Sequence, residues 1–461
     1  MAHNQSMRFA IAGGGVAGLA AALAVARAGH RAVVVERDPV EADESPRDAF
    51  DVERRGIPHF FQPHAFLPRG RRVLREFAPD VLDALLAAGA EPQDLAVKLR
   101  GERSPADDDL VYLWVRRPVV EWALRRAATA EPGVELLAGV QVEGLLTSED
   151  GARAVGVATD RGAVHGDMVV DALGRCRAPQ GWPRSLTTAP EDSGVIYYSR
   201  YFALADGTDH LDWPLLNPRG DLGYLGFNTF RGDNRTYAII LVVPGADRDL
   251  RVLRRESAWM AACAAIRPLD ILTSPEHGRP ITDVMPMGGL MNVKRTGDAG
   301  VVGFVAVGDA LCHTDPVFAY GLSFALAHAQ ALARATVGAP DADAVISSYR
   351  AAVVPEAEER YRLACETDDA RGRRWRGEPL DVGSRGGCYP LFSFTTALAA
   401  APYDDLVLRR TIGRIGLLDR TAVFDDDTEL HARIERIFGE LMTSPPPSPG
   451  PSREALLGLL G

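Results

Sequence analysis

The sequence is poor in lysine, has only five cysteines and contains no long apolar run. The cysteines are scattered and no two are spaced as Cys-x-x-Cys, which excludes the common zinc spacings and suits a reducing cytoplasm. No apolar segment reaches the length of a transmembrane helix, and the first residues, MAHNQSM, lack the pattern of a signal peptide. We therefore expect a cytoplasmic protein without a membrane span or a metal site.

Net charge and chain length limit the possible partners and the number of domains. The net charge of −11 argues against nucleic acid or an anionic membrane as a partner. A chain of 461 residues exceeds a single hydrophobic core, so two or three domains are expected. We find no internal repeat.

The most informative segment reads RFAIAGGGVAGLAAALAVARAGHRAVVVER. An apolar strand over 9–12 leads into Gly13-x-Gly15-x-x-Gly18, and a helix is predicted over 17–28. Gly13 permits the tight turn, Gly15 lets the backbone approach a pyrophosphate, and Gly18 lets the helix pack closely on the strand. The helix N-terminus favours the anion through its free N–H groups and its dipole. This pattern predicts a dinucleotide-binding βαβ unit.

A second strand, predicted over 32–35, ends in an acidic residue. Glu36 follows Gly18 by 18 residues and is placed to accept hydrogen bonds from a ribose 2′-OH. A carboxylate there would repel a 2′-phosphate, so NADP is disfavoured at this site. The alternative is a glycine-rich turn in an ordinary βαβ unit.

A second motif lies at residues 303–329, GFVAVGDALCHTDPVFAYGLSFALAHA. A buried strand is predicted to deliver Gly308 and Asp309, and a loop containing Pro316 then enters a helix at Gly321. Asp309 is placed to accept a hydrogen bond from a ribityl hydroxyl. The N-terminus of that helix would stabilise negative charge on a reduced flavin.

Apolar spacing predicts the remaining elements. Residues 195–243 alternate and are rich in aromatic side chains, which indicates an antiparallel sheet facing a substrate. The prolines of 444–452 indicate a stiff linker to a short apolar tail, 455–460, that docks on the body or on a partner. The other predicted elements are helices over 69–88, 117–130, 321–337 and 341–365 and strands over 111–114, 134–142, 154–159, 168–171 and 301–307, with a polar loop over 39–58.

These motifs resemble the FAD-dependent monooxygenases of the para-hydroxybenzoate hydroxylase fold, in the branch that holds polyketide epoxidases and tryptophan-type halogenases. A third motif, DMVVDALGR over 167–175, carries the same resemblance. The resemblance implies an α/β Rossmann-like FAD-binding domain with an inserted antiparallel-sheet substrate domain and a C-terminal helical region. The implied parts are 1–175 and 286–365 for FAD binding, 176–285 for the substrate, 366–442 for the helical region, and 443–461 for the linker and tail.

The resemblance also implies a cofactor site. Arg117 matches the arginine that contacts FAD phosphate or ribityl oxygens, with the adjacent Arg116 as the alternative. The implied FAD-contacting residues are Gly13, Gly15, Val16, Ala17, Gly18, Glu36, Arg37, Arg117, Val142, Asp171, Gly308, Asp309, Pro316, Gly321 and Leu322.

One departure from the family concerns reduction of the flavin. Members that are reduced directly by NAD(P)H usually carry Asp-Gly in the third motif, where this chain has Leu173 and Gly174. A leucine makes no charge-assisted contact, so electrons come either from NAD(P)H directly or from a separate flavin reductase. A second departure is Ala319-Tyr320-Gly321 in place of Gly-x-Gly before the last helix.

Candidate catalytic residues come from three segments. His64, with His59 beside it, and His313 are candidate proton donors or substrate contacts; the alternative for each is a histidine satisfied by backbone or solvent. Tyr198 and Arg200 share one face of the predicted substrate sheet, where Arg200 binds a carboxylate or thioester carbonyl or else forms a cross-strand salt bridge. The arginines around Trp375 meet an acidic carrier protein or form a solvated face.

The resemblance implies hydroxylation or epoxidation of a hydrophobic small molecule through a flavin C4a-hydroperoxide, with FAD, O2 and NAD(P)H, in specialised metabolism such as antibiotic biosynthesis. A halogenase is a rival, but Trp-x-Trp-x-Ile-Pro is absent, and Lys98 and Lys294 lie outside the stretch where a halogenase lysine is expected. The other rivals are a prenyl-reductase-type flavin enzyme and a non-catalytic flavin-binding partner subunit.

Overall fold

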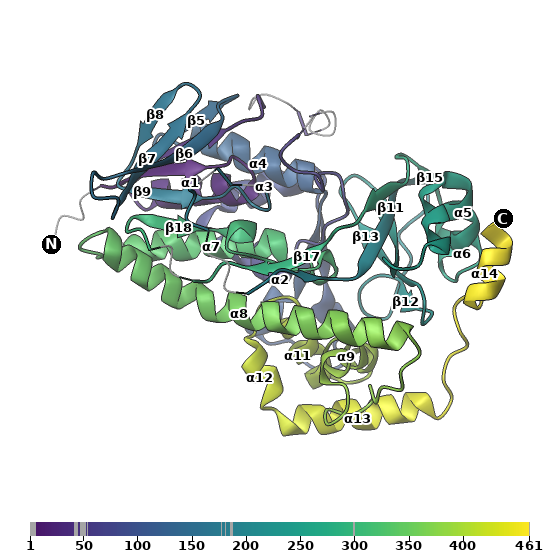
Figure 1. Cartoon of the computed structure of the whole chain (residues 1–461). Coiled ribbons are helices and arrows are strands. Elements are labelled where there is room, and N and C mark those ends of the chain that lie inside the picture. Colours follow the sequence, from purple (N-terminus) through teal and green to yellow (C-terminus); the bar gives the residue numbers. More distant parts are fainter. Residues whose placement is uncertain are drawn as a thin grey trace.

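The computed structural model describes residues 6–40, 45–46, 52, 54–176, 178–179, 181–184, 188–297 and 300–460. The loop predicted over 39–58 lies in large part outside these residues. In Figure 1 the strands of a parallel sheet and the strands of an antiparallel sheet occupy opposite ends of the molecule, and the long helix α8 (Ala342–Trp375) runs beside both. No helix in the described part of the chain is both long and apolar enough to cross a membrane.

The described residues form a five-stranded parallel sheet in the order β18-β9-β1-β2-β5. Its strands read as nearly continuous apolar runs because most are buried on both faces. The motif-bearing strands therefore lie side by side, although they are far apart in sequence. Their bounds are β1 (Arg8–Ala12), β2 (Arg31–Glu36), β5 (Val134–Ala138), β9 (Met168–Asp171) and β18 (Phe304–Ala306).

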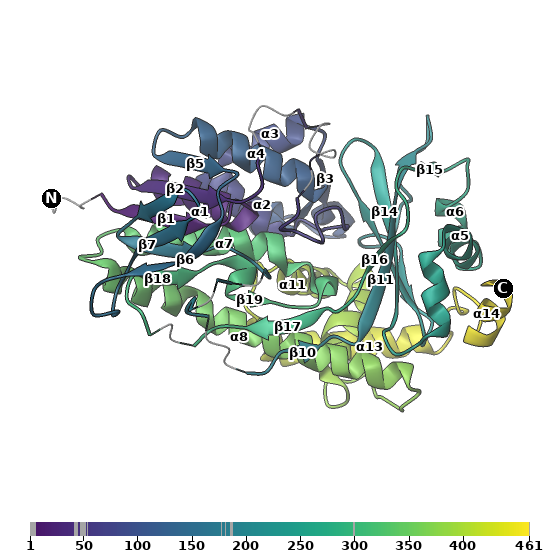
Figure 2. The same cartoon turned by 45° about the horizontal axis from the view of Figure 1, so that its top comes forward.

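Two layers cover this sheet. Phe9 and Ile11 of β1 pack into the core shared with three helices, α1 (Val16–Arg27), α4 (Arg117–Ala130) and α7 (Tyr320–Thr336). Ala10 and Ala12 face the opposite way, toward the antiparallel strands β6 (Val142–Thr147), β7 (Ala154–Thr159) and β8 (Gly162–His165), because side chains alternate along a strand. Figure 2 shows the two layers on either side of β1 and β2.

Two predicted elements are divided in the structure. The helix predicted over 69–88 is α2 (Pro68–Phe77) followed by α3 (Pro79–Ala87). Ala78 precedes a proline, which disfavours the helical conformation, and it has φ −143° and ψ 58°. The strand predicted over 134–142 turns at Gly139, whose φ is +68°, so β5 joins the parallel sheet and β6 joins the antiparallel layer.

The second large sheet is antiparallel, as predicted, with described strands in the order β12-β13-β14-β11-β15 and with β16 also paired to β11. Its outer face packs on α5 (Glu256–Ala264) and α6 (Leu269–Leu272), and its inner face looks toward the parallel-sheet domain (Figure 2). The strands are β11 (Val195–Leu204), β12 (Arg219–Asp221), β13 (Gly226–Arg231), β14 (Thr236–Pro244), β15 (Gly278–Pro280) and β16 (Met285–Met287), and a separate pair is β3 (Glu91–Asp94) with β4 (Val111–Trp114).

A small sheet and α8 connect the two domains. The small sheet has the order β10-β17-β19, formed by β10 (Glu191–Asp192), β17 (Met291–Lys294) and β19 (Cys312–His313). Asp341 caps α8 through a hydrogen bond from Ala344 N. The helix continues past residue 365 to Trp375, so it crosses the boundary predicted there. The helical region that follows contains α9 (Tyr389–Leu391), α10 (Ala397–Ala400), α11 (Asp405–Ile415), α12 (Thr421–Asp425) and α13 (Thr428–Met442).

The C-terminal tail docks on the body of the protein, which resolves the two alternatives. It forms α14 (Arg453–Leu460), beside α5 in Figure 1, and Leu456 is fully buried there. Arg453 pairs with Asp247 at 2.8 Å and with Asp249 at 2.7 Å. The tail therefore covers the outer side of the antiparallel sheet.

Candidate active site

A groove of ≈ 890 Å³ crosses the carboxyl ends of β1 and β2. Gly15, Glu36, Arg117, Leu173 and Gly321 are among the residues that line it. In open α/β sheets, ligands bind outside the carboxyl ends of the strands. The glycine turn, the acid after β2 and the start of α7 thus converge on one groove.

Each glycine of the first motif has a distinct steric role. Gly13 has φ +106°, and a Cβ there would lie 2.5 Å from Ala172 O. A Cβ on Gly18 would lie 1.8 Å from Gly13 O, so only glycine lets α1 pack on the turn. A Cβ on Gly15 would contact only Ile57 Cδ1, at 3.7 Å, and would take up space in the groove. Val16 and Ala17 also line the groove.

The carboxylate of Glu36 is held rigidly at the end of β2. Its Oε2 accepts hydrogen bonds from Gly14 N at 2.7 Å and from Arg54 Nη2 at 3.2 Å. Its Oε1 accepts one from Asp38 N at 2.9 Å and keeps capacity for a second hydrogen bond. Glu36 and the neighbouring Arg37 both line the groove, as expected for ribose contacts.

Replacing Glu36 by alanine should weaken FAD retention by roughly 10- to 100-fold, because one hydrogen bond to a charged group contributes about 1.5–3 kcal/mol. Glu135→Ala is a matched control, since Glu135 is exposed on the neighbouring strand β5. FAD titration of both variants, followed by flavin fluorescence, measures the difference. Equal affinities would show that the ribose is held elsewhere.

Arg117 lies in the groove, whereas Arg116 does not. Arg117 Nη1 donates to His59 Nε2 at 2.7 Å, and burial lowers the pKa of Arg117 to about 10. Arg116 instead forms a two-pronged pair with Asp233, at 2.9 Å and 2.7 Å. The structure therefore favours Arg117 as the cofactor-facing arginine.

The fit of the groove to FAD can be judged from the buried N–H groups in its wall that have no hydrogen-bond acceptor. Among the described residues, His59 Nδ1 is buried and makes no hydrogen bond, and the buried Arg117 Nε makes only an ion pair with Glu121 Oε2, at 4.0 Å. Because Nε2 of His59 accepts from Arg117, its Nδ1 carries the proton. The unsatisfied N–H of His59, beside the Arg117 guanidinium at the N-terminus of α4, suits the phosphate and ribityl oxygens of FAD.

The second motif lies at the other end of the groove. Asp309 lines the groove, as do Gly321 and Leu322 in the first turn of α7. A Cβ on Gly321 would lie 3.5 Å from Asp309 Oδ1, so the carboxylate borders the start of the helix. Gly308 lies behind it, where a Cβ would meet Ala17 Cβ at 3.0 Å.

The contact between Asp171 and FAD that the resemblance implies is wrong, because Asp171 is buried away from the groove. Asp171 is fully buried at the end of β9 and pairs with Arg184 Nε at 2.6 Å and Nη2 at 2.7 Å. It also accepts from Trp182 Nε1 at 2.9 Å. These bonds occupy the carboxylate, so Asp171 holds the β9 turn in place and does not line the groove, whereas Val142 does.

A smaller cavity of ≈ 80 Å³, here called the inner cavity, opens beside Gly321. It shares seven lining residues with the groove: His59, His64, Arg175, Asp309, His313, Gly321 and Leu322. It is therefore an extension of the groove toward the antiparallel sheet. Its remaining wall is largely apolar, with polar side chains at intervals, and includes Phe230, Met287, Asp315, Pro316 and Phe324.

The two histidine candidates are neutral. Burial is the main cause that lowers the pKa of His64 to about 3 and that of His313 to about 4. His64 Nδ1 contacts Gln62 O at 2.6 Å and His313 Nδ1 contacts Asp309 O at 3.1 Å. Since a carbonyl only accepts, each Nδ1 carries the proton and each Nε2 is an acceptor.

The lowered histidine pKa values predict acid sensitivity. The unfolded chain binds protons below about pH 6.5 while the folded chain does not, so stability should fall as the pH drops from about 6.5 toward 4. At pH 5 each histidine should cost on the order of 2 kcal/mol. Thermal unfolding against pH measures this, and His64→Gln should flatten the curve. An exposed control, His165→Gln, should retain the wild-type slope; a wild-type curve flat from pH 6.5 to 4 would contradict the prediction.

Tyr198 and Arg200 lie away from the site, which corrects their candidacy. Arg200 Nη2 pairs with Glu256 of α5 at 2.8 Å, and Tyr198 packs in the core under α5. Tyr197 belongs to the opposite face and packs with Phe230 and Met287. The alternation was predicted, but a period of two does not say which face looks at the cofactor.

Sequence reasoning passed over Arg175. It borders both the groove and the inner cavity, and it makes no hydrogen bond or ion pair with any other described residue. Its place in the third motif was the available signal. Its charge is one cause that lowers the pKa of His59 and of His64.

The arginines around Trp375 are paired within the chain. Arg373 and Arg376 both contact Glu378 at 2.8 Å, and Arg374 lies 3.8 Å from Asp221. Arg371 is held by two buried aspartates. The pairing leaves little free positive charge here for an acidic carrier protein. Among the described residues there is also no cluster suited to a metal ion.

Comparisons with known proteins agree with this geometry. Residues 8–44 match a family model described as an FAD binding domain. A search among curated proteins finds no match.

Solved structures give the fold of the whole chain. PqsL, a probable FAD-dependent monooxygenase from Pseudomonas aeruginosa, superposes with a TM-score of 0.60 at 17% identity, over 81% of this chain and 99% of that one. A variant of HpxO from Klebsiella pneumoniae, in complex with FAD, has a TM-score of 0.58 at 16% identity, over 80% and 92%. The myxobacterial chondrochloren halogenase CndH has a TM-score of 0.58 at 19% identity, over 98% and 99%. The chain thus has the fold shared by FAD-dependent monooxygenases and FAD-dependent halogenases.

Proposed function

We propose that this protein is an FAD-dependent monooxygenase that hydroxylates or epoxidises a hydrophobic small molecule, in specialised metabolism. The observation that carries the proposal is the junction at Asp309, His313, Gly321 and Leu322, where the groove meets a largely apolar inner cavity. FAD, when bound and reduced, activates O2. A substrate in the inner cavity would lie next to the flavin.

The residues of the groove and of the inner cavity have separate roles. Glu36 would hold the ribose of FAD and Arg117 its phosphate or ribityl oxygens, and the N-terminus of α7 would favour negative charge on the flavin. Phe230 and Phe324 exclude water from the inner cavity. The neutral His313 offers an acceptor at Nε2 beside the substrate.

The two lysines of the chain favour oxygenation over halogenation. In the family that the motifs resemble, a halogenase is expected to hold a lysine beside its substrate. Lys98 pairs with Asp212 at 2.8 Å, and Lys294 Nζ lies 5.1 Å from the centre of the Tyr361 ring. Neither lines the groove or the inner cavity.

Anaerobic reduction of the FAD-loaded protein tests the function. Leu173 lines the groove in place of an aspartate, so we expect slow bleaching with NADH or NADPH alone and rapid bleaching when a flavin reductase is added. Reoxidation should then consume O2 and, with a substrate, insert one oxygen atom. Rapid bleaching by NAD(P)H alone would make the protein self-sufficient. Product formation without O2 would refute monooxygenation in favour of a reductase or dehydrogenase.

A further inference from the structure

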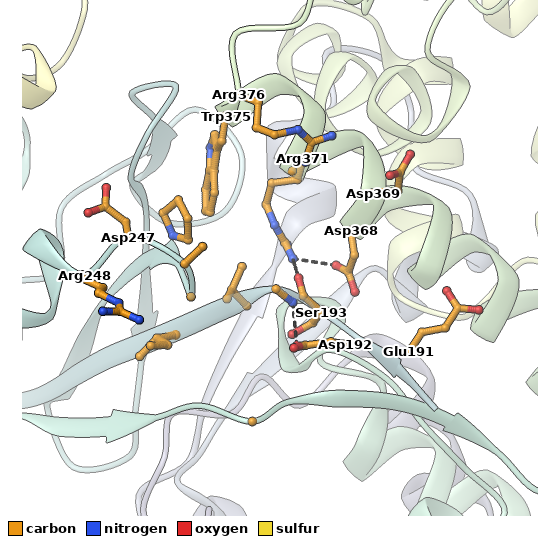
Figure 3. A pocket seen from close by; sticks show the side chains of 18 of the residues that line it. Glu191, Asp192, Ser193, Asp247, Arg248, Asp368, Asp369, Arg371, Trp375 and Arg376 are labelled. Atoms are coloured by element: carbon orange, nitrogen blue, oxygen red, sulfur yellow. Dashed lines mark hydrogen bonds and ion pairs between the residues drawn. The ribbon is translucent and has the colours of Figure 1, made fainter. Parts of the chain in front are cut away.

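A second opening adjoins the groove at Gly289, which lines both. This outer cleft, of ≈ 1030 Å³, lies between the end of the antiparallel sheet and the last turns of α8. Figure 3 shows Ser193, Asp247, Asp368, Arg371 and Trp375 around it. It receives solvent directly and has no role in the proposed binding of FAD.

A buried cluster of polar side chains forms the floor of the outer cleft. Arg371 Nη2 donates to Asp368 Oδ1 at 2.7 Å and to Asp315 Oδ2 at 2.8 Å, which places one guanidinium between two carboxyl groups. Asn292 Nδ2 donates to Asp368 Oδ2 at 2.7 Å, and Asn292 Oδ1 accepts from Asp315 N at 2.7 Å. The Tyr197 hydroxyl donates to Asp315 Oδ1. This set is here called the carboxyl cluster.

The carboxyl cluster reaches both cavities. Asp368 and Arg371 line the outer cleft, and Asp315 lines the inner cavity. Asp315 is 1% exposed, so the path between the two cavities runs through protein and not through open solvent. The carboxyl cluster is therefore a polar connection between the inner cavity and the outer cleft.

The charges in the carboxyl cluster are unequal. Two carboxyl groups face a single guanidinium, so one carboxyl group remains without a full charge partner. Burial and the neighbouring Asp315 carboxylate raise the pKa of Asp368 to about 8, and the two aspartates raise that of Arg371. The titratable and charged groups facing Asp368 are Asp315, Arg371, Tyr197 and Cys365.

We propose that Asp368 and Asp315, bridged by Arg371, share one proton and exchange it between the outer cleft and the inner cavity. Solvent protonates Asp368 at the outer cleft. The O–H bond on Asp368 then breaks as one forms on Asp315, and the negative charge moves to Asp368, while Arg371 contacts both groups throughout. Asp315 releases the proton to the inner cavity. The proton exchange itself does not depend on the proposed function. Only the use of the proton in the reaction at the flavin rests on that function.

Infrared spectroscopy of the full chain tests the shared proton without any cofactor. The carbonyl stretch of a buried protonated carboxyl group should be present at neutral pH and should disappear as the pH passes about 8. Asp368→Asn, which keeps the shape of the side chain, should remove this band. Asp369→Asn is the matched control, because Asp369 is exposed in the same outer cleft. An unchanged band in Asp368→Asn would overturn the proposal.

Proton uptake tests the route. The FAD-loaded protein is photoreduced in weak buffer with a pH-indicator dye, and Asp368→Asn should take up protons at least tenfold more slowly than wild type and Asp369→Asn. Equal rates would overturn the exchange. If Asp368→Asn does not fold, Tyr197→Phe takes its place, and the loss of a donor to Asp315 should raise the pH at which the infrared band disappears; an unmoved midpoint would contradict the sharing. Because the infrared result needs no oxygen chemistry, it stands if monooxygenation fails.

Discussion

Replacing Gly18 by alanine is expected to abolish tight FAD binding and to destabilise the parallel-sheet domain. A Cβ at this position would lie 1.8 Å from Gly13 O. The clash is with backbone, so no side-chain rotation relieves it, and α1 must move off the turn. Overpacking of this kind typically costs about 1–3 kcal/mol, and FAD affinity should fall by at least tenfold if the turn holds the pyrophosphate as the proposed function requires.

Gly144 provides the control for this experiment. It lies in β6, and a Cβ there would meet nothing within 4 Å, so Gly144→Ala should behave as wild type. Thermal unfolding and FAD titration of both variants measure the effect. A Gly18→Ala protein that binds FAD normally would mean that the close approach of α1 to the turn is not needed by the cofactor.

Replacing Arg117 by glutamine is expected to weaken FAD binding by roughly 10- to 100-fold, since hydrogen bonds to charged groups contribute about 1.5–3 kcal/mol. Arg117 lines the groove and donates to His59 there, which supports this role. Glutamine keeps part of the polar contact with His59 but carries no charge for a phosphate. Flavin fluorescence during FAD titration measures the loss.

The neighbouring arginine should give the opposite result. Arg116→Gln leaves the fully buried Asp233 carboxylate without its cation, so stability should fall by about 3 kcal/mol, while FAD affinity per folded molecule stays unchanged. Arg126→Gln, exposed on the same helix, should change neither property. If Arg116→Gln lost FAD while Arg117→Gln kept it, the assignment of the two arginines would be reversed.

Local rules were sufficient for the parts of the site that lie within one βαβ unit. The predicted helix over 17–28 is α1 to within one residue, and the roles predicted for Gly13 and Gly18 agree with the positions that a Cβ would take. Turn geometry and the packing of a helix on its neighbouring strand depend on residues only a few positions apart. The spacing of the glycines in the sequence is therefore enough to predict them. The break at Ala78 was also within reach of sequence reasoning, because Pro79 follows it.

Long-range facts required the tertiary structure. Sequence motifs predict Asp171 at the flavin. In the structure its carboxylate instead accepts hydrogen bonds from Arg184 and Trp182, which lie on a different segment.

The sequence by itself determined the dinucleotide turn and the alternating sheet, because the conformational limits of Gly13 and the periodicity of apolar residues are local properties. The class of fold came from the resemblance of the motifs to a known family. The left-handed residue that precedes α7 is Ala319, with φ +55°, and not Gly321. Only the tertiary structure decided that Tyr197 rather than Tyr198 contacts Asp315 at the inner cavity, and that Asp315, Asp368 and Arg371 meet. A strand's period of two is symmetric between its faces, and a buried charge is stable only where the fold delivers its partners.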